Sequence, residues 1–73
     1  MKTEIFAKIS PYDIDFLTKI IEAYDNLGIS STINPSEGEI IIRVTEDTYH
    51  DMMDILHHMP FPVQILDSSE LSI

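Results

Sequence analysis

The chain has 73 residues and no cysteine, and its 13 carboxylates against four basic residues give a net charge of -9. This length is enough for one small domain, and without cysteine the chain cannot form a disulfide or a thiolate site. Four scattered cations in an acidic chain cannot neutralise a row of phosphates, which argues against nucleic acid and anionic membrane surfaces as partners.

The N-terminal part of the chain predicts a strand followed by a helix. Apolar and polar residues alternate from Thr3 to Ile9, which is the period of a strand. Ser10 is placed to cap the helix that follows, because Pro11 occupies its first position. This helix carries an apolar stripe and is expected to run to about Asn26, and Gly28 is expected to end it in a left-handed conformation.

A hairpin of two strands is predicted next. Residues Ile29 to Asn34 alternate again, and the turn from Pro35 to Gly38 reverses the chain. The segment from Glu39 to Val44 is the most apolar strand and is expected to lie centrally in the sheet. The positions in the first strand of the hairpin that are expected to face the core are Ile29, Ser31 and Ile33.

A second helix and a last strand complete the pattern. Thr45 is expected to cap this helix. Pro60 and Pro62 end it before a strand from Val63 to Leu66. Residues 68–73 are expected to form a flexible C-terminal tail. The core stripe of the helix is expected to contain Tyr49, Met52, Met53, Leu56 and Met59.

The order strand-helix-strand-strand-helix-strand predicts an α+β fold of the ferredoxin-like type. In this βαββαβ sandwich, a four-stranded antiparallel sheet carries two helices on one face. Residues 1–67 are expected to form this single domain. Its predicted core contains Ile5, Ile9, Leu17, Ile21, Ile42, Val44, Met53, Leu56 and Ile65.

The predicted second helix also carries every histidine of the chain. On a helical wheel, His50, Asp54 and His57 fall on the polar side, away from the apolar stripe. Imidazole and carboxylate groups are ligands that zinc and related metals accept, so these residues are a candidate divalent-metal site. The alternative is the solvated face that any amphipathic helix needs, and the spread of the residues along two turns favours it.

The remaining residues predict neither catalysis nor a cofactor. The serines lie in no nucleophile motif, and the carboxylates form no recognisable acid-base pair. Both glycines are explained by a helix end and a turn, so they indicate no phosphate-binding loop. We therefore expect a protein that is not an enzyme and has no cofactor.

The face of the sheet that the helices leave uncovered is expected to be a binding surface. Strand alternation turns Phe6 and Ile41 to this face, where they should touch as neighbours on central strands. An apolar patch with cations on an otherwise acidic chain predicts a homodimer or a protein partner. The alternative is that a few apolar residues simply stay exposed. The residues expected on this face are Phe6, Lys8, Thr32, Ile41, Arg43 and Leu66.

The segment "IIEAYDNLGISSTINPSEG" is the most specific part of a resemblance that covers Ile9 to about Leu66. The chain resembles a small bacterial domain-of-unknown-function family, number 4911, found mostly in Firmicutes as stand-alone chains. The resemblance implies an ACT-like fold and supplies no catalytic residue. ACT domains bind amino acids at a dimer interface, near the loop from the first strand to the first helix. The resemblance to ACT domains thus implies a ligand site in the "SPYD" loop and at one nearby serine. Its residues would be Ser10, Pro11, Tyr12 and Ser30. This loop lacks the glycine that follows proline in ACT domains.

Three functions follow from these features. The leading interpretation is a non-catalytic protein-interaction or regulatory module. The second is an ACT-type sensor of a small ligand such as an amino acid, and the third is a divalent-metal-binding protein that uses the histidines. The first residues, "MKTEIFAKIS", are too short and too charged for a signal peptide, and no apolar run approaches about 20 residues, so we expect the protein to be cytoplasmic.

Overall fold

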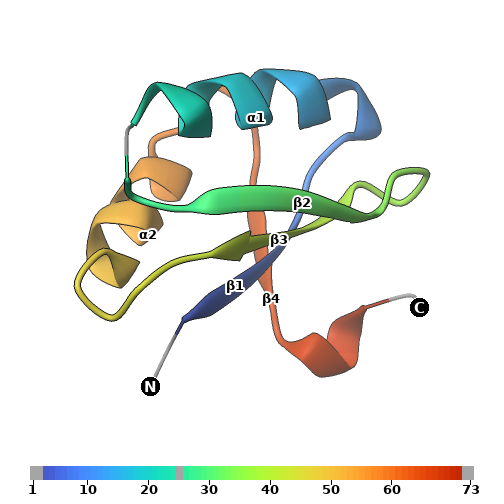
Figure 1. The fold of residues 1–73 in the computed structure, drawn as a ribbon. Coiled ribbons are helices and arrows are strands. Elements are labelled where there is room, and N and C mark those ends of the chain that lie inside the picture. The colour runs from blue at the N-terminus through green and yellow to red at the C-terminus, as the bar shows by residue number, and fades with distance from the viewer. Residues whose placement is uncertain (1–2, 25, 72–73) are drawn as a thin grey trace.

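The computed structural model describes residues 3–24 and 26–71, and its elements follow the predicted order (Figure 1). The α+β class and the ferredoxin-like arrangement are confirmed. The elements are β1 (Glu4–Lys8), the 3-10 turn η1 (Pro11–Asp13), α1 (Ile14–Ala23), β2 (Ile29–Asn34), β3 (Glu39–Arg43), α2 (Tyr49–His57), β4 (Gln64–Leu66) and the 3-10 turn η2 (Ser68–Glu70). Within the described residues, no helix is long and apolar enough to span a bilayer.

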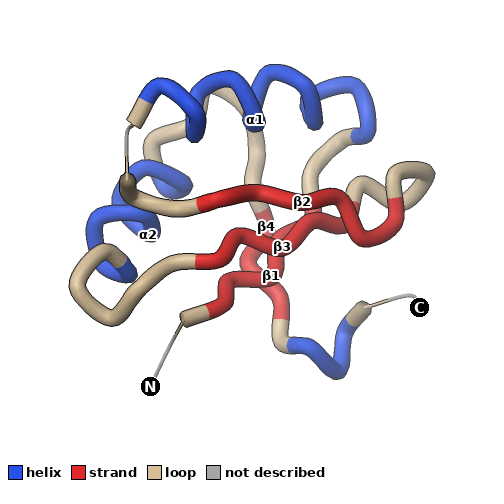
Figure 2. The backbone as a smooth tube through the Cα atoms, viewed as in Figure 1, coloured by secondary structure: helices blue, strands red, loops and turns tan. Residues whose placement is uncertain are grey.

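The four strands form one antiparallel sheet in the order β2-β3-β1-β4. Strands β1 and β3 are therefore the central pair, as predicted. Figure 2 shows the strands as one layer, with α1 and α2 packed on the same side of it. The other side of the sheet carries no helix of this pair, and we call it the open face.

The core lies between the sheet and the two helices. Residues at alternate positions of β1 and β3 meet Leu17 and Ile21 of α1 and Met52 and Leu56 of α2. Because alternate strand residues share a face, one side of each central strand is buried by this contact. The buried residues of this cluster are Ile5, Ala7, Ile9, Leu17, Ile21, Ile40, Ile42, Val44, Met52 and Leu56.

Two predicted core residues are less buried than expected. Met53 is only partly buried, and Met52 beside it is fully buried instead. Ile65 is 37% exposed, so its prediction as a core residue is wrong. Ile65 pairs with Ala7 and so shares the helix side of the sheet with it. It is nevertheless exposed, because it belongs to the three-residue edge strand β4, where solvent reaches it.

Strand β2 has the opposite orientation to the predicted one. Ile29 pairs with Arg43 and Ser31 pairs with Ile41, and both partners alternate with the helix-facing residues of β3. Directly opposed residues share a face, so Ile29 and Ser31 lie on the open face, and their expected inward orientation is wrong. Ile33 falls at a register irregularity between Thr32 and Asn34 and has no paired position.

The ends of α1 also differ from the prediction. Ser10 makes no side-chain capping bond, and the turn η1 precedes the helix. The helix ends at Ala23 rather than near Asn26, and Asp25 between them lies outside the described residues. Asn26, not Gly28, takes the left-handed conformation, with φ 67°. Asparagine tolerates this region better than most residues, because its short polar side chain bonds locally.

The turn before α2 is formed by two threonines. The helix begins after Thr48, whose hydroxyl accepts the Thr45 backbone N–H at 3.0 Å. The Thr48 N–H donates to the Thr45 carbonyl at 3.2 Å. The N-cap position is therefore Thr48 and not the predicted Thr45, because the chain makes one further turn before the helix starts, and the Thr48 side chain makes no capping bond to α2.

The segment predicted as a tail contains the turn η2. The Glu70 N–H donates to the Asp67 carbonyl at 2.9 Å, and the Glu70 carboxylate accepts the Asp67 N–H at 2.8 Å. The last two residues of the predicted tail, 72 and 73, lie outside the described residues.

Candidate functional site

An apolar row crosses the centre of the open face. Phe6 of β1 lies directly opposite Ile41 of β3 on one side and Leu66 of β4 on the other. Ile41 and Leu66 are 7% and 8% exposed, and Phe6 is half-buried. The predicted contact between Phe6 and Ile41 is consistent with this pairing. Phe6 is therefore the most accessible of the three residues in the row.

Ion pairs flank this row at both ends of β1. The Arg43 Nε lies 3.7 Å from a Glu4 carboxylate oxygen, and the Lys8 Nζ lies 3.5 Å from a Glu37 carboxylate oxygen. The two predicted cations are thus each next to a carboxylate of the same chain. Such exposed pairs contribute little stability. Their effect is local neutralisation of charge around the row.

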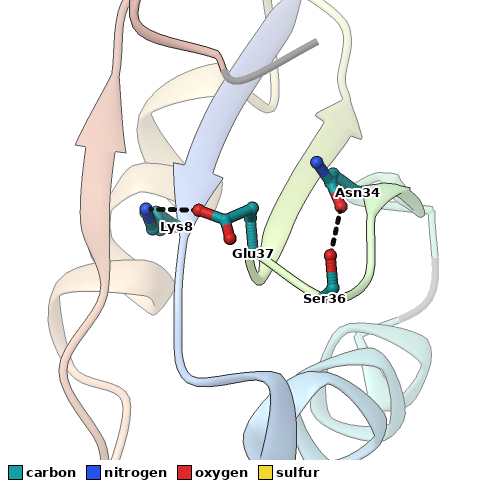
Figure 3. A network of polar contacts seen from close by, with 4 residues as sticks. All are labelled: Lys8, Asn34, Ser36 and Glu37. Carbon is teal, nitrogen blue, oxygen red and sulfur yellow. Dashed lines mark hydrogen bonds and ion pairs between the residues drawn. The ribbon is translucent and has the colours of Figure 1, made fainter.

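The turn between β2 and β3 brings Glu37 across to Lys8 (Figure 3). In the same turn, the Ser36 hydroxyl donates to the Asn34 side-chain oxygen at 3.0 Å. Glu39, opposite Lys8 in the register, is a buried charged residue. Neither Glu37 nor Glu39 was among the predicted site residues, although the tight turn after Asn34 places both near Lys8.

Thr32 does not belong to the open face, so its prediction there is wrong. It pairs with Ile40, whose side chain is part of the helix-side core. The error has the same origin as that for Ile29, because a strand displaced by one residue turns every side chain to the other face.

The four residues of the implied amino-acid site are not all brought together. Ser10, Pro11 and Tyr12 form one turn, in which the Ser10 carbonyl accepts the Asp13 N–H at 2.9 Å. Tyr12 is almost fully exposed. Ser30 lies opposite Ile42, which pairs with Ile5 near the start of β1. The loop follows the other end of β1, about 10 Å or more away along the strand.

A pocket of about 330 Å³ lies at the start of β2, away from the first loop. The apolar residues of its lining are Leu27, Ile29 and Val44, and the polar ones are Asn26, Arg43 and Thr45. Sequence reasoning missed this pocket, because it forms between two loops distant in sequence. Its complete lining is Asn26, Leu27, Gly28, Ile29, Arg43, Val44 and Thr45.

The predicted metal ligands are not gathered into one site. Among residues 3–24 and 26–71, no group of three or more His, Asp or Glu side chains is placed to hold a metal ion. The His57 Nδ1 lies 2.7 Å from the Met53 carbonyl, to which it donates as the N–H tautomer. The His50 ring packs edge-on against Tyr49 with centroids 5.4 Å apart. The backbone carbonyl of Asp54 accepts a hydrogen bond from the Nδ1 of His58, at 2.7 Å.

Comparison with known proteins identifies the family of the chain. Neither the curated proteins nor the solved structures contain a match. One family model, described as a domain of unknown function (DUF4911), matches residues 7–63. The matched segment runs from β1 to the residue before β4 and includes both helices. With more than half of its length matched, the chain belongs to this DUF4911 family.

Proposed function

We propose that this chain is a non-catalytic protein-interaction module and that its open face binds the partner. The observation that carries the proposal is the row Phe6, Ile41 and Leu66, which runs across three strands on the face without α1 and α2. Phe6 at the centre of this row remains partly accessible, and aromatic residues such as phenylalanine are enriched at protein interfaces.

Charge supports this choice of surface. The chain carries a net charge of -9, so most of its surface repels an acidic partner. At the open face, each cation lies next to a carboxylate, Arg43 with Glu4 and Lys8 with Glu37. A protein surface with an apolar centre can therefore approach this face without meeting a large unbalanced charge.

The test is a quantitative pull-down from native cytoplasm with three forms of the chain. Phe6→Glu places a charge at the centre of the row, and Tyr12→Glu makes the same change at an exposed aromatic residue elsewhere. We expect a captured partner to bind the wild type and Tyr12→Glu alike, and Phe6→Glu at least about tenfold less. Circular dichroism checks that both variants stay folded. Equal capture by Phe6→Glu would refute the open face as the binding surface.

The second candidate function is a small-ligand sensor, and the 330 Å³ pocket is the observation that favours it. The volume lies at the small end of ligand pockets. A ligand that binds only the native state raises the melting temperature, so a thermal-shift screen of amino acids tests the idea. Arg43→Gln should remove the shift if the Arg43 guanidinium holds the ligand carboxylate in this pocket. Loss of the shift in Ser10→Ala would instead locate the ligand at the first loop.

Divalent-metal binding is the third candidate, which only the histidine content of α2 supports, since the described residues gather no set of three ligands. The same screen tests it. Zinc bound by His50 and His57 would raise the melting temperature, and His50→Ala with His57→Ala would abolish that shift. A shift that survives both substitutions would exclude these histidines as the ligands.

A further inference from the structure

The two edges of the sheet differ in how well they resist pairing with another strand. Edge β4 has three residues, with Pro62 shortly before it and Asp67 immediately after it. Edge β2 has six residues, Ile29–Asn34, and contains neither proline nor a charged side chain. Short length, proline and charge are the usual means by which proteins block edge pairing. Edge β4 therefore has this protection along its whole length. Edge β2 is interrupted only near its end, by the register irregularity between Thr32 and Asn34 and by Pro35 after it, so its uncharged first part from Ile29 to Thr32 stays open to pairing.

The uncharged character of β2 extends beyond the strand. The segment from Leu27 to Ser36 contains no Asp, Glu, Lys or Arg, although the chain has 13 carboxylates and four basic residues in total. Within this segment Ile29 is 73% exposed, which is unusual for an isoleucine in a strand. Ser31 and Thr32 in the middle of β2 are also exposed.

We propose that β2 pairs antiparallel with β2 of a second copy of this chain, so that the two sheets become one continuous sheet. Two chains that each carry a charge of -9 repel, so they associate most easily where neither presents a carboxylate. The β2 edge meets this condition. A basic partner is a poorer fit for this edge, because the edge has no carboxylate to attract it. A two-fold axis through the seam pairs identical strands of equal length and satisfies their free backbone groups.

This inference rests on the proposed function and extends it. A two-fold axis perpendicular to the sheet keeps both open faces on the same side. The two rows of Phe6, Ile41 and Leu66 then belong to one larger surface that a protein partner can contact. The exposed Ile29 side chains lie on that same side, next to the seam.

A cysteine scan tests the seam directly, because the natural chain contains no cysteine. Ser30→Cys, Ser31→Cys and Thr32→Cys each place one thiol on β2, and Gln64→Cys places a matched thiol on edge β4. Residues opposed across an antiparallel pair have Cβ atoms about 4.5–5.5 Å apart, close to the separation in a disulfide. Under mild oxidation, we expect the β2 variant nearest the axis to form covalent dimer at least about tenfold faster than Gln64→Cys. Equal rates for all four variants would overturn the proposal.

Sedimentation velocity distinguishes failure of this inference from failure of the open-face proposal. We expect Ile29→Lys to weaken the dimer about tenfold or more, because it replaces an apolar side chain beside the seam with a charged one, and a charge on an edge strand disfavours pairing. Gln64→Lys, with the same charge on the other edge, should dimerise like the wild type. Phe6→Glu should also remain dimeric even though it loses the partner. A wild-type monomer, or a dimer that only Phe6→Glu dissociates, contradicts the β2 seam.

Discussion

Gly38 shows how a residue without a side chain joins the hairpin turn to the end of β1. It adopts φ 70°, a region that other residues rarely occupy. Its carbonyl accepts the Ile9 N–H at 2.9 Å, and a Cβ atom at Gly38 would run into the Ile9 carbonyl oxygen. The close approach of these two backbone segments therefore requires glycine for two separate reasons.

We predict that Gly38→Ala lowers the free energy of unfolding by about 1–3 kcal/mol, because it adds both backbone strain and a steric overlap. Urea titration followed by circular dichroism measures this change. Ser36→Ala in the same turn is the control, since it removes only one hydrogen bond between exposed side chains and should change stability by less than about 0.5 kcal/mol. If Gly38→Ala were as stable as Ser36→Ala, the tight contact with Ile9 would be disproved.

Gly28 has a different role, which the sequence alone did not indicate. Its φ is not in the left-handed region, so it is not needed for conformational freedom. A Cβ atom there would lie 2.9 Å from the Arg43 carbonyl oxygen and 2.9 Å from the terminal methyl of Met52. Glycine thus lets the start of β2 lie against the end of β3 and α2, and in doing so it forms part of the wall of the pocket.

At the scale of secondary-structure elements, the central strands were predictable and the edge strand was not. In β1 and β3, branched residues occupy every helix-facing position except Ala7, so their apolar pattern determines which face is buried. The row on the open face followed from the same alternation. Strand β2 offers only two isoleucines among small polar residues, and little of it is buried.

The orientation of β2 is therefore set by its pairing with β3 and by the turn that joins them. The register irregularity between Thr32 and Asn34 interrupts the alternation that sequence reasoning followed from Ile29 to Ile33. The pocket escaped prediction for a related reason. Its walls depend on how the loop before β2 packs against the end of β3, a contact between distant segments that no local pattern encodes.

The start of α2 gives a prediction at this scale. The Thr48 hydroxyl accepts the Thr45 N–H at 3.0 Å, which satisfies a backbone donor in the turn that precedes the helix. We expect Thr48→Val to lower the free energy of unfolding by about 0.5–1.5 kcal/mol, since it keeps the shape but removes the acceptor of this hydrogen bond. Thermal unfolding measures the loss. Thr48→Ser retains the hydroxyl and should recover most of the stability, and equal losses for both variants would show that the hydroxyl is not what matters.

At the scale of the whole molecule, the chain combines exposed apolar surface with a large net charge. One side of the sheet is covered by α1 and α2, and the apolar row and the edge strand β2 remain available on the other side and at the rim. A domain of this size buries a smaller fraction of its surface than a large one, so it gains from covering such surface with a second chain. The net charge of -9 opposes that association over a longer range than the contacts that favour it.

The dependence of dimerisation on salt decides between a β2 seam and an interface built on ion pairs. The screening length falls from about 30 Å at 0.01 M ionic strength to about 10 Å at 0.1 M, so added salt weakens the repulsion between two acidic chains. The β2 seam contains no charged side chain to be weakened in return. We therefore predict that the association constant rises with ionic strength over this range, as measured by sedimentation equilibrium in potassium chloride. An interface of opposite charges would respond in the other direction, because salt screens attraction as readily as repulsion. An association constant that falls as salt is added would thus exclude the uncharged seam. Ile29→Lys provides the internal control, since it should associate more weakly than the wild type at each salt concentration.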